Sequence, residues 1–329
     1  MALSEFRKDL VSGEWVLFST GRKRRPHQSN SKDQLSSPTE CPFDDLKKTG
    51  QEIVWNYPEG SEEITVIKNK FPAVKPGLCA PLFNIGPFEA HEGSGTHDVF
   101  VYKDHNKLFA DFSEPEFVNV IRAYKKRYLE ILQLEDCAQY VLLFHNYGSD
   151  AGASIMHPHS QVLSTPILPP DVSRSLHGAK NFFQANQKRV YDLMIAWEKE
   201  QKKRIVYEND FFVAFCPFVS KYPYEIRIFA KDGHAHFEKM PDALDPHLAN
   251  ALSVVLKKTS KALDNPSFNF FIHTAPVESS EKDLHDFYSW HVEIIPKLKI
   301  DAGFEMGTGV VINVVDPDEA AQLLRDTQV

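Results

Sequence analysis

The sequence predicts an α+β protein that contains two tandem units, each an antiparallel sheet with a packed helix. Short stretches alternate apolar and polar residues, as strands with one buried face do, and longer stretches carry apolar residues at helical spacing. The same kinds of element also recur in the same order in both halves of the 329-residue chain. We therefore expect a pseudo-duplicated chain with two domains, residues 1–170 and residues 171–329.

The first unit is expected over residues 30–170, after an N-terminal arm. A strand that ends in a Phe-rich turn is predicted within 64–74, and a short alternating strand over 98–102. Apolar residues three and four positions apart predict a helix from about 115 to 132. An apolar strand, a loop and a second strand are expected within 140–165.

The second unit is expected over residues 203–300 and repeats this order. Its strand and Phe-containing turn fall within 205–218, and its short alternating strand over 225–229. The matching helix is predicted from about 246 to 263, and the final strand–loop–strand within 268–298.

Three segments lie outside the repeated elements. Residues 171–204 are expected to form one long connecting helix between the units. Residues 29–40 are rich in Ser, Asp and Pro, which favours a mobile loop. A short helix over 317–325 is predicted to close the chain.

The bulk composition excludes several classes of protein. A formal net charge of −8 argues against general nucleic-acid binding, and no apolar stretch is long enough to span a membrane. A cytoplasmic location is the default expectation. The four cysteines stand far apart with no C-x-x-C pair, so disulfides are not indicated: Cys41, Cys79, Cys137 and Cys216.

The strongest functional signal is a small-residue loop followed by His157, His159 and Gln161. On a strand, residues two apart project from one face, so these three side chains would share a surface. Backbone N–H groups of a loop at Gly152–Ser154 would suit a phosphate, and a neutral histidine can attack phosphorus. The alternative is a strand with two half-buried histidines beside an ordinary turn.

The spacing of these residues resembles that of the histidine triad superfamily, whose pattern is Asn-x-Gly, then Gly-x-Ser, then His-x-His-x-His. The chain has Asn146-x-Gly148, Gly152-x-Ser154 and His157-x-His159-x-Gln161. Glutamine at the third histidine position, with Pro158 between the histidines, is similar to the galactose-1-phosphate uridylyltransferase family and to ADP-glucose phosphorylase. The resemblance implies two histidine-triad-like units.

The resemblance extends over nearly the whole chain. Further motifs of the family stand in the expected order: Arg22-Lys23-Arg24-Arg25-Pro26, Cys41-Pro42-Phe43, Asn69-Lys70-Phe71-Pro72-Ala73, His273-Thr274-Ala275-Pro276, Trp290-His291-Val292-Glu293 and Gly303-Phe304-Glu305.

The resemblance implies a UDP-glucose–hexose-1-phosphate uridylyltransferase. UMP would pass from a UDP-hexose to a hexose 1-phosphate, with galactose 1-phosphate as the expected acceptor, through a covalent nucleotidyl-His159. Ser154, Gly152 and Gln161 would hold the phosphate, and the neutral amide of Gln161 would not supply a proton for hydrolysis. An ADP-sugar phosphorylase or adenylyltransferase is the alternative, and a non-catalytic nucleotide-binding module is a second one.

Other binding residues are implied only by the resemblance. Asn69 and Phe71 would bind the uridine, and Asn146 would contact the phosphates or orient the loop. Arg22 and Arg25 would reach phosphates, in this family often across a dimer interface, so a homodimer is expected. The sugar would be bound by three residues near the C-terminus: Lys299, Phe304 and Glu305.

The chain departs from the family at several of these positions. Lys70 stands where the best-known branch has an acidic residue, and Phe304 replaces a tyrosine. Val311 stands where the family has a glutamine near the end of the chain that contacts the phosphate or sugar. These departures leave the base and the sugar open.

The resemblance also implies a zinc site. Its ligands would be Cys41, Asp44, His105 and His157, with Asp44 in place of the family's second cysteine. The alternatives are that Cys41 is a small buried residue while Asp44 caps a turn, or that Asp45 competes as a ligand.

The second unit differs from the first at the positions that match the two histidines. Aligned on its last strand, His291-Val292-Glu293 matches His157-Pro158-His159, which puts Glu293 at the nucleophile position. One competent site per chain follows, with the second unit as a scaffold or recognition half. No iron is expected at His273, His291 and Glu293, because relatives with a second metal site have histidine at the last position.

Overall fold

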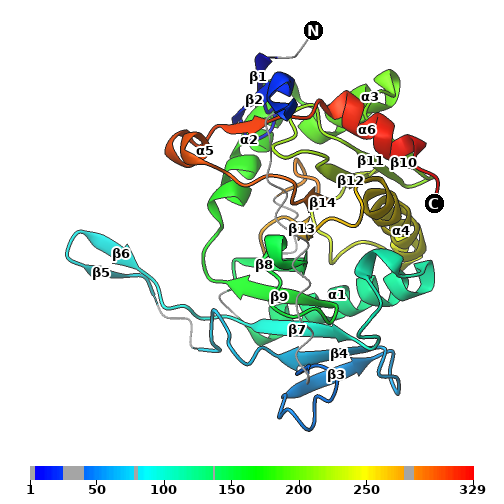
Figure 1. Cartoon of the computed structure of the whole chain (residues 1–329). Coiled ribbons are helices and arrows are strands. Elements are labelled where there is room, and N and C mark those ends of the chain that lie inside the picture. The colour runs from blue at the N-terminus through cyan, green and yellow to red at the C-terminus, as the bar shows by residue number, and fades with distance from the viewer. Residues whose placement is uncertain (1–3, 25–40, 78–80, 136–137, 278–284) are drawn as a thin grey trace.

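The computed structural model describes residues 4–24, 41–77, 81–135, 138–277 and 285–329. One ten-stranded sheet, antiparallel between all neighbours, dominates them (Figure 1). Across the sheet the strands are β10 (Ile205–Glu208), β11 (Phe212–Phe215), β12 (Ile226–Ala230), β14 (His291–Pro296), β13 (Phe268–His273), β8 (Tyr140–Tyr147), β9 (His159–Thr165), β7 (His97–Tyr102), β4 (Ile64–Lys68) and β3 (Ile53–Tyr57). The predicted α+β class is confirmed.

Two helices pack on one face of this sheet. Helix α1 (Glu114–Leu134) begins after Ser113, whose backbone N–H and hydroxyl both donate to the Glu116 carboxylate. Its apolar stripe and that of α4 (Asp245–Ala262) meet buried strand residues in one continuous core. The helices predicted at 115–132 and 246–263 are confirmed within two residues.

The opposite face is covered differently in the two halves. Helices α2 (Pro170–Asn186) and α3 (Val190–Gln201) pack over the strands of the second half. The single helix predicted over 171–204 is therefore wrong: Gln187 adopts a left-handed conformation with φ of 53°, which ends α2. In the first half, Phe43 and Leu46 pack on this face instead.

The two ends of the chain meet in a small second sheet. Strands β1 (Ser4–Lys8), β2 (Trp15–Ser19) and β15 (Val311–Asn313) form it, and a short 3₁₀ helix, η1 (Thr20–Arg24), follows β2. Helix α5 (Gly303–Thr308) precedes β15, and α6 (Pro317–Asp326) confirms the helix predicted near the end of the chain. The predicted loop 29–40 and Arg25 lie outside the described residues.

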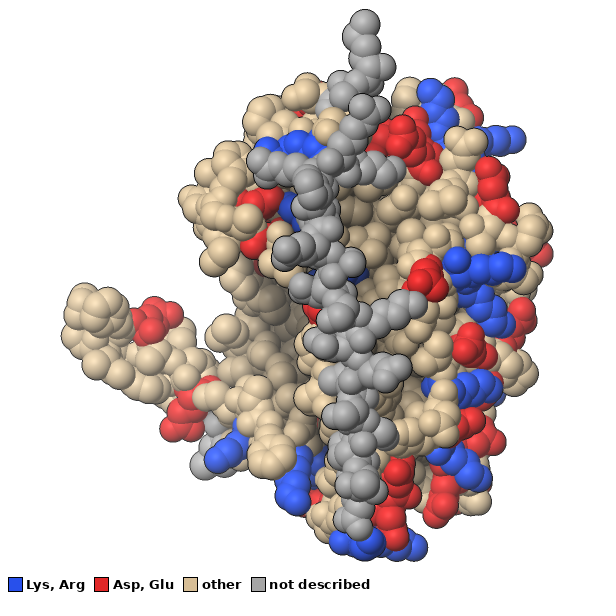
Figure 2. Space-filling model, in the orientation of Figure 1, with Lys and Arg blue, Asp and Glu red and all other residues tan. Residues whose placement is uncertain are grey.

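A hairpin stands out from the body of the molecule. It consists of β5 (Phe83–Ile85) and β6 (Phe88–Ala90), and it projects beside the large sheet (Figures 1 and 2). Ile85 and Phe88 on it are 62% and 71% exposed. On the face seen in Figure 2, acidic and basic side chains are interspersed. No helix in the described part of the chain combines the length and apolarity needed to cross a membrane.

Candidate functional site

His159 and Gln161 lie in one pocket on the face of the sheet opposite α1. The pocket has a volume of about 670 Å³. Its walls include six residues that the sequence analysis assigns to the site: Asn69, Phe71, Gly152, Ser154, His159 and Gln161. Strand β9 presents His159 and Gln161 two residues apart, while His157 lies in the bend just before the strand.

Two glycines shape the loop between β8 and β9. Gly148 and Gly152 have φ of 80° and 82°, a conformation that other residues rarely adopt, and a 3₁₀ turn, η3 (Ser149–Ala151), lies between them. A Cβ on Gly148 would lie 2.1 Å from Ser267 Oγ. The loop therefore depends on glycine at its first position both for conformation and for space.

Asn269 holds this loop and contacts Asn146 beside it. The Asn269 amide Nδ2 donates to Asn146 Oδ1 at 2.8 Å and to the Ala151 carbonyl at 2.9 Å. Because Asn269 belongs to β13, the second half of the chain holds the loop of the first half. Asn146 is thus linked to the loop through Asn269, and its expected contact with the phosphates stays a prediction.

The protonation state of His159 follows from its surroundings. Its Nδ1 lies 2.9 Å from the His157 carbonyl, which can only accept, so Nδ1 carries the hydrogen and Nε2 has the lone pair. Burial lowers the pKa of His159 below its ordinary value, and the hydrogen bond to the His157 carbonyl offsets only part of this effect. The Phe43 ring also packs edge-on against it, with centroids 5.3 Å apart. His159 is therefore a neutral imidazole whose Nε2 carries the lone pair.

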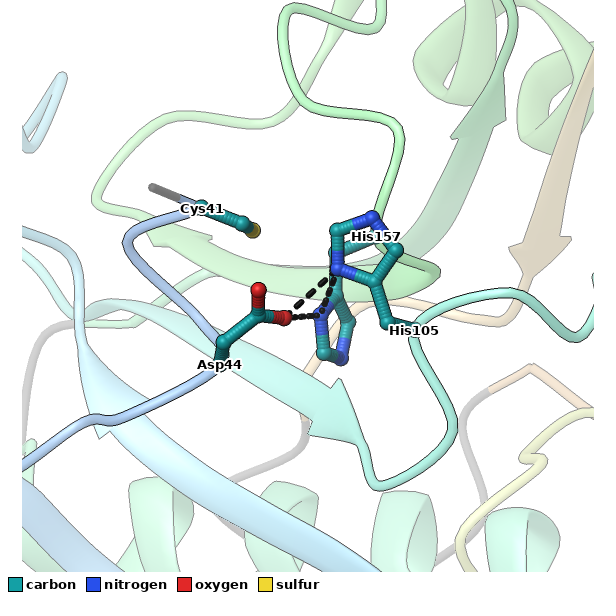
Figure 3. Close-up of side chains that lie close together, drawn as sticks. All are labelled: Cys41, Asp44, His105 and His157. Atoms are coloured by element: carbon teal, nitrogen blue, oxygen red, sulfur yellow. Dashed lines mark hydrogen bonds and ion pairs between the residues drawn. The ribbon is translucent and has the colours of Figure 1, made fainter. Parts of the chain in front are cut away.

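A second cluster next to His159 contains the four residues expected to bind zinc (Figure 3). One ligand atom from each of Cys41, Asp44, His105 and His157 lies within 4.8 Å of the others. His105 Nδ1 is 2.6 Å and His157 Nδ1 is 3.1 Å from Asp44 Oδ1. Partial burial acts to raise the pKa of Asp44, but its close contacts with the His105 and His157 rings outweigh it and lower the pKa.

The donor set of this cluster fits zinc. Sulfur, two imidazole nitrogens and a carboxylate oxygen are ligands that zinc accepts in a tetrahedral site. His157 Nε2 donates to the Tyr102 carbonyl at 2.5 Å, which leaves the Nδ1 lone pair directed at the cluster. Asp45 is not one of the clustered residues.

Several expected binding residues do not line the pocket. Arg22 lies on η1, and Lys299, Phe304 and Glu305 lie at or before α5. Lys299 Nζ instead bonds the Glu305 carboxylate and, at 2.8 Å, the Ile312 carbonyl. Within the described part of this one chain, these residues and His159 are not brought together.

The second half holds a related but different cluster. His273, His291 and Glu293 also have ligand atoms within 4.8 Å of one another, but Arg227 Nε lies 3.2 Å from Glu293 Oε2. His291 Nδ1 lies 3.1 Å from the carbonyl two residues earlier, as His159 Nδ1 does. By this contact His291 resembles His159, and Glu293 stands two residues after His291 as Gln161 stands two residues after His159.

Two neighbours of these residues were not predicted from the sequence. Phe43 contacts both His157 and His159, although only its motif was noted. His97 lines the pocket and lies 2.9 Å from Gln161. The only sequence signal for His97 is its position, two and four residues before Val99 and Val101, on the same face of β7.

Comparisons with known proteins agree with this geometry. Residues 1–169 match the family model described as galactose-1-phosphate uridyl transferase, N-terminal domain, and residues 94–327 match a domain of unknown function. The chain is 33% identical to ADP-glucose phosphorylase of Arabidopsis thaliana, over 98% of this chain and 92% of that protein. It is 30% identical to galactose-1-phosphate uridylyltransferase of Thermotoga maritima, over 99% of both.

Solved structures show the same similarity. The crystal structure of the Arabidopsis ADP-glucose phosphorylase with bound ADP-glucose superposes with a TM-score of 0.85 at 31% identity, over 99% of this chain and all of that one. Fold and comparisons thus agree on the class of nucleotidyl-transferring enzymes. The chain belongs to the galactose-1-phosphate uridylyltransferase family, as its motifs predict.

Proposed function

We propose that the chain transfers UMP from a UDP-hexose to a hexose 1-phosphate, with galactose 1-phosphate as the acceptor. The observation that carries this proposal is the neutral His159, whose Nδ1 is held by the His157 carbonyl and whose Nε2 is left to react. Nε2 would attack the α-phosphorus, forming an N–P bond as the P–O bond to the departing sugar 1-phosphate breaks. An oxygen of the acceptor's phosphate then attacks the same phosphorus and releases His159.

The remaining pocket residues would bind and orient the sugar nucleotide. Ser154 and the backbone at Gly152, which line the pocket, would hold the phosphate oxygens, and Gln161 would donate one neutral hydrogen bond to them. Asn69 and Phe71 would bind the base, and the Phe71 ring is 85% exposed at the pocket, free to stack. Positioning and charge stabilisation are the main contributions a protein makes to such a transfer.

A second candidate uses the same pocket with another nucleotide. In it, an ADP-sugar gives an adenylyl-His159, and inorganic phosphate acts as the acceptor. The 33% identity to ADP-glucose phosphorylase and the superposition on its ADP-glucose complex favour this candidate.

One experiment tests both candidates. The purified protein is incubated with UDP-glucose or with ADP-glucose, without acceptor, and its intact mass is measured. A mass increase equal to one UMP supports the uridylyltransferase, and an increase equal to one AMP supports the phosphorylase. His159→Asn should prevent either adduct. Saturable binding of a sugar nucleotide with no adduct and no turnover would overturn both and leave a nucleotide-binding module.

Zinc is proposed as the resident metal of the Cys41 cluster. Cys41, Asp44, His105 and His157 would hold it, and its contribution would be structural stiffening. Because His157 lies two residues before His159, the same ligand would fix the start of the strand that carries the nucleophile.

We further propose that the active protein is a homodimer built from duplicated halves. Arg22, Lys299, Phe304 and Glu305 lie outside the pocket of their own chain, so a second copy is the natural source of these groups for each site. The exposed apolar hairpin β5–β6 supports such an interface. Residues 1–170 would be the catalytic domain, and residues 171–329 a related domain that supports it.

A further inference from the structure

His97, a residue outside the expected site, is hydrogen-bonded to Gln161 within the pocket. It begins strand β7, whose Val101 and Val99 pair with His159 and Gln161 of β9. Alternate residues of a strand share a face, so His97 lies on the pocket side as well. In the register it is opposite Leu163, which places it on the side of Gln161 that is away from His159.

The backbone of Ala73 determines which ring nitrogen of His97 carries the hydrogen. The Ala73 N–H lies 3.0 Å from Nδ1, and because a backbone N–H can only donate, Nδ1 must accept. The hydrogen of the neutral ring is therefore on Nε2. Nε2 is 2.9 Å from Gln161 Oε1, and it donates to that oxygen.

The hydrogen on His97 Nε2 also excludes a hydrogen bond from the Asn69 side chain to this nitrogen. Asn69 Nδ2 lies 3.1 Å from the same ring nitrogen, while Asn69 Oδ1 accepts the Phe71 N–H at 2.9 Å. A protonated Nε2 cannot accept, so His97 and the Asn69 amide nitrogen do not bond each other. The Asn69 amide hydrogens remain available to a ligand in the pocket.

The direction of the Gln161 amide follows from the bond to His97. A side-chain amide has oxygen on one side and NH₂ on the other. With Oε1 held on the His97 side, the NH₂ group is turned toward His159. A phosphate at His159 then meets a donor; a rotated amide would present an oxygen and repel it.

We propose that His97 is a positioning residue that fixes the Gln161 amide with its NH₂ group toward the reacting phosphate. The inference rests on the proposed nucleotidyl transfer. Ala73, His97 and Gln161 form one hydrogen-bonded chain, which links the segment that would bind the base to the group that would hold the phosphate. Holding a donor in place before the substrate arrives is how such groups lower a barrier.

Two substitutions separate the two hydrogen bonds of His97. His97→Asn can keep an acceptor for Ala73 but cannot reach Gln161. His97→Gln places an amide NH₂ near the position of Nε2 and keeps the donor to Gln161. We expect His97→Asn to lower the rate of adduct formation about 100-fold, the effect of losing one preorganised donor, with little change in KM. His97→Gln should restore most of that rate.

A double-mutant cycle tests whether His97 acts through Gln161. The rate of adduct formation is measured for His97→Asn, Gln161→Ala and the double variant. If His97 only orients the amide, the double variant should be no slower than Gln161→Ala alone. An equal fold-loss from His97→Asn with and without Gln161 would overturn the proposal, as would failure of His97→Gln to restore activity above His97→Asn.

The tautomer can be tested without turnover, which separates this inference from the proposed function. In ¹⁵N-labelled protein, the His97 signals are identified by their absence in His97→Asn. We expect an unprotonated Nδ1 and a protonated Nε2. A hydrogen on Nδ1 would overturn the inference even if adducts form, whereas absence of any adduct from wild type, with the expected tautomer, would count against nucleotidyl transfer alone.

Discussion

At the scale of single residues, Asp44 decides the metal affinity of the Cys41 cluster. Asp44→Ala removes one of four ligands and should lose zinc, and Asp44→Cys should bind zinc more tightly because thiolate is the softer ligand. The measurements are zinc content per chain and melting temperature with and without chelator, since a metal bound only by the folded state raises stability.

The adjacent carboxylate provides a matched control for this prediction. Asp45 is exposed and lies outside the cluster, and its carboxylate accepts a hydrogen bond from the Lys48 N–H at 2.9 Å. Asp45→Ala should keep its zinc. Zinc-free wild type with full activity, or zinc bound as well by Asp44→Ala, would refute the assignment of these ligands.

His145 gives the protein a measurable dependence of stability on pH. It is 1% exposed, stacks on Phe109 with ring centroids 4.0 Å apart and lies 3.0 Å from Ser160 Oγ. Burial holds the pKa of His145 well below its ordinary value of 6.5. Below that pH, His145 is therefore protonated in the unfolded chain but stays neutral in the folded chain. The stability due to neutral His145 is complete above pH 6.5 and is lost as the pH falls below it.

The test compares wild type with His145→Phe, which keeps an aromatic ring between its neighbours but does not titrate. Free energies of unfolding in urea are measured from pH 7.5 to 5.5. Wild type should lose about 1.4 kcal/mol per pH unit relative to the variant below its unfolded pKa. A difference that does not change with pH would show that His145 protonates freely in the folded state.

At the scale of elements, the loop between β8 and β9 places different demands on its two glycines. Gly152→Ala meets no atom within 4 Å and should cost only the strain of a positive φ, about 1–2 kcal/mol. Gly148→Ala carries the same strain and also drives a Cβ against Ser267, which adds about 1–3 kcal/mol of overpacking. Urea unfolding of both variants measures the difference, and equal losses would mean that the chain at Ser267, just before β13, shifts to make room.

The sequence predicts these elements where the signal is local. Alternation and helical spacing locate the strands and helices, and period two places His159 and Gln161 in one pocket. The position of His97 depends on how β7 is registered against β9, and a single strand does not carry that information. The break at Gln187 was missed because glutamine is an ordinary helix former, without the breaking signal of Gly or Pro.

At the scale of the whole molecule, the proposed dimer makes a quantitative prediction. If Arg22 serves the His159 of a partner, Arg22→Ala and His159→Asn proteins should both be inactive alone but complement each other when mixed as unfolded chains and refolded. Half of the dimers are then hybrids with one intact site of two, so about a quarter of wild-type activity should return. Sedimentation of the mixture confirms the dimer, and a mixture as inactive as its components would place each site within one chain.

The pairing of β8 with β13 has a consequence for the chain when it is cut. Five residue pairs, from Tyr147–Phe268 to Leu143–Ile272, join the halves into one sheet. A chain ending at residue 170 would expose the whole β8 edge, and such an edge readily captures another strand. Each half expressed alone should therefore self-associate or precipitate. Residues 1–170 and 171–329 produced together should instead assemble with each other. The enzyme would then behave as a split protein, and a fusion partner attached to each half could use the β8–β13 edge to report when two proteins meet.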